Sequence, residues 1–505
     1  MADHRAPPPG APTSLAILGG GTAGWMAACL FAEAWPATTI TVVEAPDVPI
    51  IGVGEGSTPQ LAHFMRRIGL GEADWMPAAH ATYKLGIDFV GWSAAPGFER
   101  YVHPFPSAVD LHTEPAFHAA HTARRRGWNV AAHPDTFFLA SWLAAHDRGP
   151  VADERFPFDA SYGYHFDAHL IGQILRDHAV THGVRHLSAR VTRVVVAATG
   201  EVDRLVLDGG GEIAAELFVD ASGFRALIAG EALGGRHLPF SGNLFNDRAV
   251  VMPTPPHTAG PRPSTRATAL TAGWAWDIPL TTRTGNGYVY SSRYLDDDAA
   301  ETELRRHLGL LDVDVPVRRL QMKVGRLADS WQGNCLAIGL AQGFLEPLEA
   351  TALHLVIATV ERFITAHRGD AATRSERRIA FNAAIARHYE GIRDYLVGHY
   401  RLNTRGTSDY WRDNARHERL SDSLKQLFTA WFTGADLVQE IARQDIAGSY
   451  SPLSWACLFA GYGTFPSEGR LRPVENPAPA FAPDFLPRCG SNFLRHVDAL
   501  MQVHR

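Results

Sequence analysis

A glycine-rich turn near the start of the chain is the feature that most limits its fold. Residues 19–24 read GGGTAG and directly follow a short apolar run at 14–18. A predicted helix over 25–35 comes next, and a predicted strand over 39–43 ends at Glu44. A strand, a Gly-x-Gly-x-x-Gly turn, a helix, a second strand and an acid, in this order, predict a dinucleotide-binding fold. The alternative is a glycine turn in an unrelated α/β unit.

Each residue of this turn has a separate task in such a fold. Gly19 makes the tight turn, Gly21 lets the backbone approach a pyrophosphate, and Gly24 lets helix and strand pack closely. The helix N-terminus directs unpaired N–H groups at the phosphates, and Glu44 can accept hydrogen bonds from ribose hydroxyls. We therefore predict that the cofactor contacts include Gly19, Gly21, Thr22, Ala23, Gly24 and Glu44.

Two later stretches favour FAD over NAD as the nucleotide. Residues 217–223 (LFVDASG) are a predicted strand that ends in Asp-Ala-Ser-Gly, and residues 335–343 (CLAIGLAQG) are a strand that enters a glycine turn. Both resemble the second and third flavin-contact segments of the aromatic-hydroxylase flavoprotein fold. Many members of that fold carry Asp after the glycine of the third segment, whereas this chain has Leu340.

Composition excludes several classes of protein. A net charge of −6 and the lack of a basic stripe argue against nucleic-acid binding. Four cysteines without CxxC spacing argue against a disulfide framework or a metal site, and they favour a reducing, cytoplasmic location. No apolar run reaches about 18 residues, so we expect no membrane span. Of the 47 basic residues only Lys84, Lys323 and Lys425 are lysines, which makes each a stronger functional candidate.

The order of predicted elements indicates a mixed α/β (α+β) chain in two parts. We expect an FAD-binding domain over 13–365, interleaved with β-rich substrate segments at about 85–140 and 240–325 that form a second sheet over the flavin. Helices are expected over 167–177, with Asp167 as N-cap, and over 380–397 and 420–441. Residues 366–505 are predicted to be mainly helical and to cover the substrate, with simple packing as the alternative.

A tryptophan-rich strand narrows the chemistry. Residues 273–279 read GWAWDIP. On a strand, Trp274, Trp276 and Ile278 point to one side and form an apolar wall, and Pro279 ends the strand or marks an edge. An aromatic core strand is the commoner role of such a tryptophan pair.

Trp-x-Trp-x-Ile-Pro is the signature of the flavin-dependent tryptophan halogenases, and the chain resembles this family over nearly its whole length. The shared stretches are GGGTAGW (19–25), IGVGEGSTP (51–59), KLGIDF (84–89), HPF (103–105), YHFDAHL (164–170), DASGFR (220–225), the Trp strand and GFLEPLEAT (343–351). Several motifs in the right order are much more specific than any one of them.

The resemblance implies a halogenase that uses FAD as FADH2, O2 and a halide, chloride or bromide, to make hypohalous acid. Lys84 and Glu349 match the two catalytic positions. Lys84 holds the oxidant by a hydrogen bond or as a haloamine, a role that arginine cannot fill because its guanidinium is never a neutral nucleophile. Glu349 orients the oxidant, or stabilises the cationic ring and takes its proton. A surface lysine, and a structural role for neighbouring Glu346, are the alternatives.

Further site residues are implied by the same resemblance. The halide would be held by backbone N–H groups at a helix start, at Thr351 and Ala352, where the family often has glycine at the second position. The Trp strand would separate substrate from flavin, and the glycine-rich strap 52–56 would link the two sites. Other implied flavin contacts are Val53, Gly54, Glu55, Val191, Gly339 and Phe344, and the implied substrate-pocket residues are His103, Phe105 and Trp455.

The sequence also bears on substrate and partners. Free-tryptophan halogenases carry a C-terminal stretch that binds the amino-acid zwitterion, and residues 445–463 do not match it. We therefore expect a small aromatic substrate of indole type, either an unsubstituted indole or a larger indole-bearing compound, in preference to free tryptophan. The sequence shows no second nucleotide-binding motif that could bind NAD(P)H. A separate NAD(P)H-dependent flavin reductase would therefore supply FADH2. The alternatives are a flavin-dependent aromatic monooxygenase and a non-catalytic flavin-binding paralogue.

Overall fold

The computed structural model describes residues 10–47, 55–369, 371–474 and 481–504. The part of the fold that contains the glycine turn is built on a six-stranded sheet. Neighbouring strands of this sheet are parallel, except for one antiparallel pair at its edge. The order is β9 (Arg185–Ser188), β2 (Thr39–Glu44), β1 (Ser14–Leu18), β13 (Leu217–Asp220), β22 (Cys335–Ala337) and β21 (Trp331–Gln332). The expected strands at 14–18 and 39–43 are thus confirmed, and Glu44 ends the second of them.

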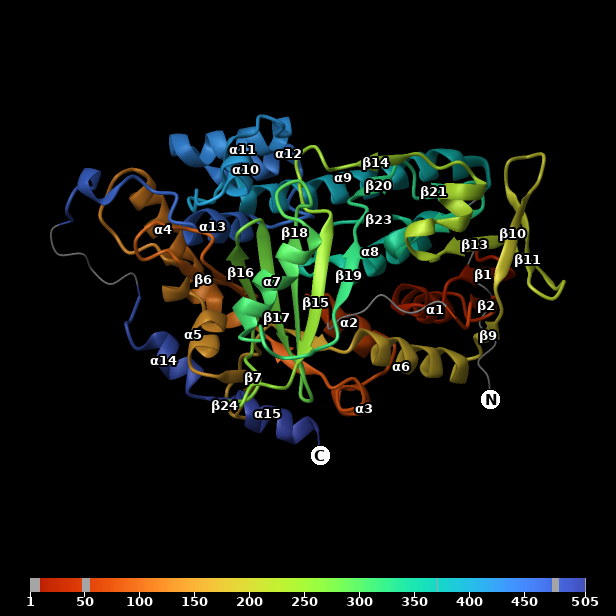
Figure 1. Ribbon diagram of the computed structural model, residues 1–505, viewed down its shortest axis with the longest axis horizontal. Coiled ribbons are helices and arrows are strands. Elements are labelled where there is room, and N and C mark those ends of the chain that lie inside the picture. Colours follow the sequence, from red (N-terminus) through yellow and green to blue (C-terminus); the bar gives the residue numbers. More distant parts are fainter. Residues whose placement is uncertain (1–9, 48–54, 370, 475–480, 505) are drawn as a thin grey trace.

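Helices pack on the central strand of this sheet. α1 (Thr22–Ala34) lies against α6 (Ala168–Thr181) and α8 (Ala352–His367), as Figure 1 shows on its right-hand side. Leu15, Ile17, Met26 and Phe31 are all buried, because a parallel sheet covered by helices has no solvent face. Asp167 caps α6 as predicted, since its Oδ1 accepts hydrogen bonds from two backbone N–H groups of the first turn.

A second, seven-stranded sheet occupies the middle of the molecule (Figure 1). Its order is β19 (Arg318–Gln321), β15 (Arg248–Thr254), β18 (Thr284–Tyr290), β17 (Gly273–Pro279), β16 (Thr265–Leu270), β5 (Gly86–Val90) and β6 (Arg100–Pro104). Both predicted β-rich segments therefore contribute to one sheet. They meet where β16 pairs in parallel with β5.

Two details of the prediction are wrong. The segment 85–140 is less β-rich than expected, because after β6 it forms α4 (Glu114–Arg125) and enters α5 (Leu139–Ala145). The helix expected over 420–441 is two helices, α11 (Asp422–Thr433) and α12 (Leu437–Gln444). The break lies at Gly434, which takes the left-handed conformation with φ 76° and ends α11.

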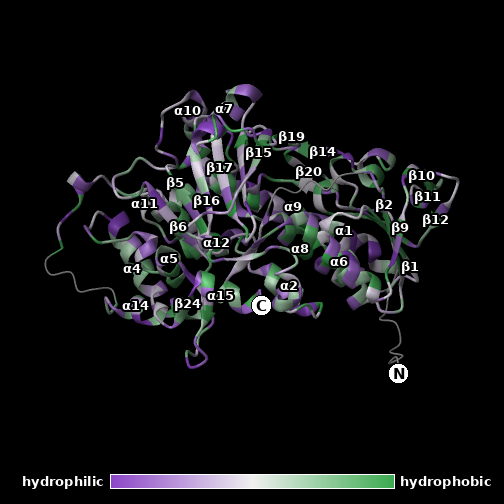
Figure 2. Ribbon diagram, turned by 60° about the horizontal axis from the view of Figure 1, so that its bottom comes forward, coloured by the Kyte–Doolittle hydropathy of each residue, from purple (hydrophilic) through white to green (hydrophobic). Residues whose placement is uncertain are grey.

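The described residues after 366 are mostly helical. α9 (Arg374–Arg401) is 28 residues long and contacts α8, α10, α11 and α13, so it connects the flavin half with the C-terminal helices. The others are α10 (Asp409–Arg416), α13 (Pro452–Gly461), α14 (Phe485–Gly490) and α15 (His496–Val503), with the short strand β24 (Phe493–Arg495). In Figure 2, α10 and the helix α7 (Asp297–Leu308), which lies between β18 and β19 in the sequence, are largely hydrophilic, as expected for outer helices.

Small sheets complete the fold. The sheet β3-β8-β4 joins Glu55–Gly56, Gly163–Phe166 and Thr82–Lys84, and so anchors the end of the glycine strap beside Lys84. The remaining sheets are β10 (Val191–Val196) with β11 (Val202–Leu207) and β12 (Glu212–Ala214), β14 (His237–Pro239) with β20 (Gly325–Leu327) and β23 (Gly343–Phe344), and β7 (Arg148–Ala152) with β24. The remaining helices are α2 (Gln60–Arg67) and α3 (Glu72–Trp75).

Within the described ranges, no helix is both long and apolar enough to span a bilayer.

Candidate active site

The glycine turn has the shape that a bound nucleotide requires. A Cβ on Gly24 would lie 1.9 Å from the carbonyl oxygen of Gly19, so only glycine allows α1 to pack this closely on the turn. Gly19 has φ 119°, and its Cβ would lie 2.2 Å from the carbonyl oxygen of Ala221. A Cβ on Gly21, by contrast, would meet no atom within 4 Å, and no side chain caps the N-terminus of α1 there. The surface at Gly21, where the sequence predicts a pyrophosphate, is thus open.

Glu44 lies directly beside this turn. A Cβ on Gly20 would come within 2.2 Å of the Glu44 side chain, which explains the third consecutive glycine. Glu44 Oε2 lies 2.9 Å from Nε2 of His186, whose ring stands edge-on to Trp25 at 5.2 Å between centroids. The carboxylate is therefore held at the end of β2, where it can meet a ribose.

The other predicted flavin contacts lie on several different elements of the fold. Gly339 has φ 57°, and its Cβ would lie 2.8 Å from that of Ala23, so the third segment crosses directly over the start of α1. Phe344 packs edge-on to Phe224 at 5.5 Å. Thr22 donates a hydrogen bond to the carbonyl of Ala168, 3.2 Å away.

Val191 is the partly buried first residue of β10. Glu55 begins β3 and pairs with Phe166, and burial raises the pKa of its carboxyl to about 7. Val53 and Gly54 lie outside the described residues.

Lys84 is buried at the end of β4. Its side chain is fully enclosed, and its Nζ lies 5.5 Å from the centre of the Phe105 ring. A Cβ on Gly56 would lie 3.1 Å from this Nζ, so the backbone of Gly56 lies next to the amine. Burial lowers the pKa of Lys84 to about 8, although the charge of Glu349 opposes the shift. The interpretation of Lys84 as an ordinary surface lysine is therefore wrong.

Glu349 ends a short 3₁₀ turn, Pro347–Glu349, that leads into α8. Ala350 follows in the left-handed conformation with φ 54°, and Thr351 precedes the helix, which begins at Ala352. The Glu349 side chain is buried, and burial by itself raises the pKa of its carboxyl. A hydrogen bond from His399 and electrostatic interactions with His103, His399 and Lys84 outweigh this effect and hold the pKa below its ordinary value.

The N-terminus of α8 has the expected features of an anion site. No side chain caps it, so its first backbone N–H groups are not occupied by a cap. Thr351 is buried and Ala352 is exposed. Ala352 is not among the residues with positive φ, so alanine is accommodated without strain where the family often has glycine.

His399 is the residue of this cluster that the sequence did not reveal. It lies in α9 and is fully buried, with Nε2 2.8 Å from Oε1 of Glu349 and Nδ1 2.9 Å from the hydroxyl of Tyr462. Its ring stacks on Phe89 at 4.6 Å and 26°. Fifty residues separate it from Glu349, and one histidine in a long helix gives no spacing signal.

Glu346 belongs to a different network. Its Oε2 accepts hydrogen bonds from the Tyr400 hydroxyl at 2.5 Å, from Asn246 Nδ2 at 2.8 Å and from Trp274 Nε1 at 3.2 Å. Burial raises the pKa of its carboxyl. Glu346 thus connects Trp274, near the start of the Trp strand, with Tyr400 of α9 through hydrogen bonds. Glu349 instead interacts electrostatically with Lys84.

The Trp strand has the predicted alternation. Trp274, Trp276 and Ile278 are buried in the main core, whereas Ala275 faces a separate cluster on the other side of the sheet. The two indoles lie 6.1 Å apart, and Gly287 on the adjacent strand makes room for Trp276, because a Cβ there would lie 2.1 Å from the indole. Pro279 ends β17, which is an inner strand and not an edge strand.

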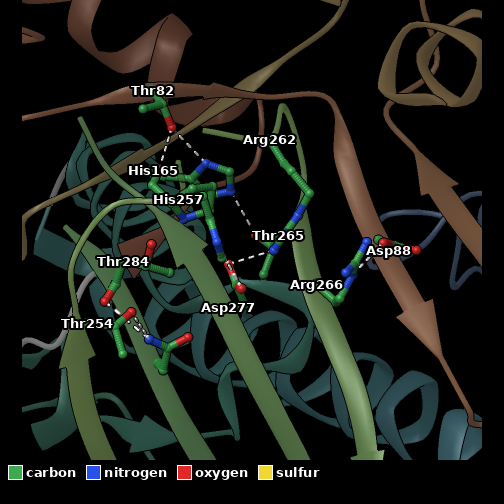
Figure 3. Close-up of polar contacts among 12 residues, drawn as sticks. Thr82, Asp88, His165, Thr254, His257, Arg262, Thr265, Arg266, Asp277 and Thr284 are labelled. Atoms are coloured by element: carbon green, nitrogen blue, oxygen red, sulfur yellow. Dashed lines mark hydrogen bonds and ion pairs between the residues drawn. The ribbon is translucent and has the colours of Figure 1, made fainter. Parts of the chain in front are cut away.

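A neutral histidine on β8 links Thr82, on the strand of Lys84, to Thr265, on the strand next to the Trp strand (Figure 3). Thr82 Oγ1 donates to the carbonyl oxygen of Pro279 at 2.7 Å and must therefore accept from His165 Nδ1 at 2.9 Å. His165 Nε2 then accepts from Thr265, also at 2.9 Å. Burial and the charge of Lys84 keep the pKa of His165 well below its usual value. The amine therefore has an uncharged histidine next to it.

Of the predicted pocket residues, His103 lies on β6, Phe105 directly follows β6, and Trp455 lies on α13. His103 is buried on β6, its Nε2 is 3.4 Å from the Tyr395 hydroxyl, and burial lowers its pKa to about 4. Trp455, on α13, stands edge-on to Tyr395 at 4.8 Å. Tyr395 also stacks on Tyr450 at 3.5 Å. Phe105 contacts Lys84, and Tyr395 and Tyr450 interact electrostatically with Glu349, so these rings form an aromatic wall beside the amine and the carboxylate.

Within the described ranges, no group of three or more His, Cys, Asp or Glu side chains is arranged to hold a metal ion. The fold and site together define a nucleotide-binding enzyme in which a buried lysine and a buried carboxylate interact. Comparison with known proteins identifies the class.

The family model for tryptophan halogenase matches residues 14–474. The 7-chloro-L-tryptophan 6-halogenase of Kutzneria sp. (strain 744) is 35% identical over 478 residues, which cover 89% of this chain and 90% of that protein. The tryptophan 7-halogenase of Lentzea aerocolonigenes is 32% identical over 91% of each chain. The chain belongs to the tryptophan halogenase family.

Solved structures agree. A flavin-dependent halogenase from Brevundimonas sp. BAL3 superposes with a TM-score of 0.81 at 32% identity and covers 98% of this chain and 100% of its own. A tryptophan halogenase from Shewanella frigidimarina superposes with a TM-score of 0.84 at 29% identity over 98% of each chain. The predicted fold class and enzyme class are thus confirmed, and the protein is a flavin-dependent halogenase that uses FAD and a halide.

Proposed function

We propose that this halogenase acts on an uncharged indole-type aromatic and that Lys84 and Glu349 deliver hypohalous acid to its ring. The observation that carries the proposal is the pairing of a buried amine, whose pKa is lowered to about 8, with a buried carboxylate whose pKa is held below its ordinary value. Two oppositely charged groups are rarely buried without a function, because their desolvation is costly.

FAD fits the nucleotide end, because the surface at Gly21 is open, the N-terminus of α1 is uncapped and Glu44 lies beside the turn. Reduced FAD, when bound, supplies hypohalous acid from O2 and the halide. The backbone N–H groups of Thr351 and Ala352 would hold the halide. Trp274 and Trp276 keep the aromatic substrate away from the flavin, so the oxidant must reach the ring at Lys84.

Lys84 and Glu349 then have complementary roles. The amine binds the oxidant oxygen by a hydrogen bond, or its neutral form takes up the halogen. Glu349 stabilises the positive ring that forms when halogen adds, and accepts the proton that leaves the same carbon. The low-polarity surroundings strengthen both interactions.

The substrate class follows from the aromatic wall. Tyr450 and Trp455 both pack on Tyr395, whose hydroxyl lies 3.4 Å from His103 Nε2. Burial keeps His103 neutral at pH 7 because its pKa is about 4. Such a wall favours stacking of an uncharged ring over capture of a zwitterion. The relatives named above are tryptophan halogenases, so a preference for indole over free tryptophan would set this chain apart.

Residues 366–505 would act as the cover over this pocket, since α9 supplies Tyr395 and His399 and α13 supplies Trp455. A separate NAD(P)H-dependent flavin reductase would supply FADH2 by diffusion.

The test is a mass-spectrometric assay with FAD, a reductase, O2 and each halide in turn, offered indole, larger indoles and free tryptophan. We expect halogenated indole, with a higher kcat/KM than for tryptophan. Hydroxylated product without halide would favour the aromatic monooxygenase, and no product with any ring would favour a non-catalytic flavin-binding protein. A kcat/KM for tryptophan equal to that for indole would refute the substrate assignment alone.

A further inference from the structure

His399 is a buried histidine with both ring nitrogens engaged and no place in the function proposed above. One nitrogen meets Oε1 of Glu349 at 2.8 Å, and the other meets the Tyr462 hydroxyl at 2.9 Å. Phe89 covers one face of the ring by stacking at 4.6 Å. Tyr395 stands edge-on to it at 5.3 Å, so the ring cannot turn without losing these contacts.

The hydrogen on the contact with Glu349 can be assigned by chemistry. An ionised carboxylate has no hydrogen to donate, so Nε2 of His399 must carry the hydrogen and Oε1 must accept it. Tyr462, bound at Nδ1, stops the ring from turning over, since a turned ring would place carbon atoms at both contacts. The histidine therefore presents a fixed N–H donor to one oxygen of Glu349 and leaves Oε2 for other partners.

We propose that His399 is a positioning residue that keeps Glu349 ionised and turned so that Oε2 takes the proton from the halogenated ring carbon. The inference rests on the function proposed above and names the group that prepares its carboxylate. In this step the C–H bond at the halogenated carbon breaks, its electron pair returns to the ring, and the proton passes to Oε2. The cationic ring becomes the neutral aryl halide.

The other groups that face Glu349 cannot provide this support throughout the reaction. The titratable side chains that interact electrostatically with Glu349 come from β4, β6, α9, the segment between α12 and α13, and the residue directly after α13. They are Lys84, Tyr101, His103, Tyr395, His399, Tyr450 and Tyr462. Burial raises the pKa values of the four tyrosines well above 10, and His103, with a pKa of about 4, carries little charge at pH 7.

Lys84 is the remaining cation, and its charge is conditional. Its pKa of about 8 means that it loses its proton in mild alkali, and it also loses its charge if it takes up halogen. The hydrogen bond from His399 does not depend on either event. Of the contacts to Glu349, it is the one that persists when Lys84 is used by the reaction.

Two substitutions of His399 separate its two contacts. His399→Gln places an amide N–H near the position of Nε2 and retains the donor to Glu349. His399→Asn is shorter, keeps a polar group near Nδ1 and Tyr462, and loses the contact with Glu349. We expect Asn to lower kcat/KM for halogenation about 10- to 100-fold through kcat, with KM nearly unchanged. Gln should restore most of the activity.

The pH profile gives a readout that a merely structural role would not change. Without the donor the pKa of Glu349 rises, so the acidic limb of kcat/KM should move to higher pH in His399→Asn and stay in place in His399→Gln. An acidic limb in His399→Asn identical to that of the wild type would overturn the inference. Thermal midpoint and FAD binding, measured by flavin fluorescence, serve as controls for folding.

Tyr462→Phe keeps the inference testable if His399→Asn does not fold. Loss of the Tyr462 hydroxyl frees the ring to turn, and we expect a smaller shift of the acidic limb in the same direction; an unshifted limb contradicts the inference. Failure of the proposed function is recognised separately. In that case the wild type makes no halogenated product, or Glu349→Gln is as active as the wild type.

Discussion

Replacing Lys84 by methionine should abolish halogenation while stabilising the fold. Methionine fills nearly the same volume without a charge, so packing against Phe105 and Gly56 is retained. Lys84 is fully buried and its pKa falls from 10.5 to about 8. At about 1.36 kcal/mol per pKa unit, the folded state bears a cost on the order of 3 kcal/mol to keep this lysine protonated at pH 7.

The direction of the pH dependence follows from the same shift. Below pH 8 the lysine is protonated in both the folded and the unfolded state, and the whole cost is present. Between about pH 8 and 10.5 the unfolded state binds more protons, so wild-type stability rises with pH relative to the variant. The advantage of Lys84→Met in urea unfolding should therefore be largest at pH 7 and shrink towards pH 10.

The pH dependence of kcat distinguishes the two roles proposed for the Lys84 amine. With a pKa of about 8, roughly a tenth of Lys84 is neutral at pH 7, against about 0.03% of an ordinary lysine. If the neutral amine takes up halogen, kcat should rise towards pH 8 and level off. If the ammonium holds the oxidant by a hydrogen bond, kcat should fall above pH 8.

Lys84→Arg is the matched control for charge, and it should also be inactive if the neutral amine is needed. In both variants, oxidation of reduced flavin should continue and peroxide should accumulate. Full halogenation by Lys84→Met, or loss of flavin oxidation together with product, would refute this reasoning.

Two matched pairs of variants test the rest of the site. Glu349→Gln should lower halogenation about 10²- to 10⁴-fold in the mass-spectrometric assay, because it removes the proton acceptor. Glu346→Gln should stay within about threefold of the wild type, because the amide oxygen still accepts the hydrogen bonds that Oε2 receives; equal losses in the two would contradict their separation. Gly24→Ala should destabilise the fold by about 1–3 kcal/mol in urea unfolding, since its Cβ would meet a carbonyl oxygen at 1.9 Å. Gly21→Ala should leave stability unchanged but weaken FAD binding at least about tenfold, and unaltered FAD affinity would argue against the pyrophosphate position.

The sequence predicted the nucleotide end well because its signals are local. A glycine turn between a strand and a helix is constrained by sterics over a few residues, and Gly19 and Gly24 have the close contacts that the pattern requires. Strand alternation placed Trp274 and Trp276 on one face for the same reason, since period two needs only neighbouring residues.

The features that were missed have different causes. His399 meets Glu349 only because α9 packs against α8, and helical periodicity does not specify which helices pack together. The break at Gly434 was missed because a single glycine inside an apolar periodic run is compatible with a continuous helix. The helix at 114–125 was missed because the region was interpreted from its Pro, Gly and aromatic content and not from its periodicity.

The central claim is that the reacting ring meets its oxidant at Lys84 and Glu349, on the far side of the Trp strand from the flavin. A crystal structure of the enzyme with FAD and indole tests it most directly. We predict an indole carbon within about 3–4 Å of Lys84 Nζ, and the Glu349 carboxylate beside the ring. An indole stacked on the isoalloxazine, with Lys84 out of reach, would contradict the account.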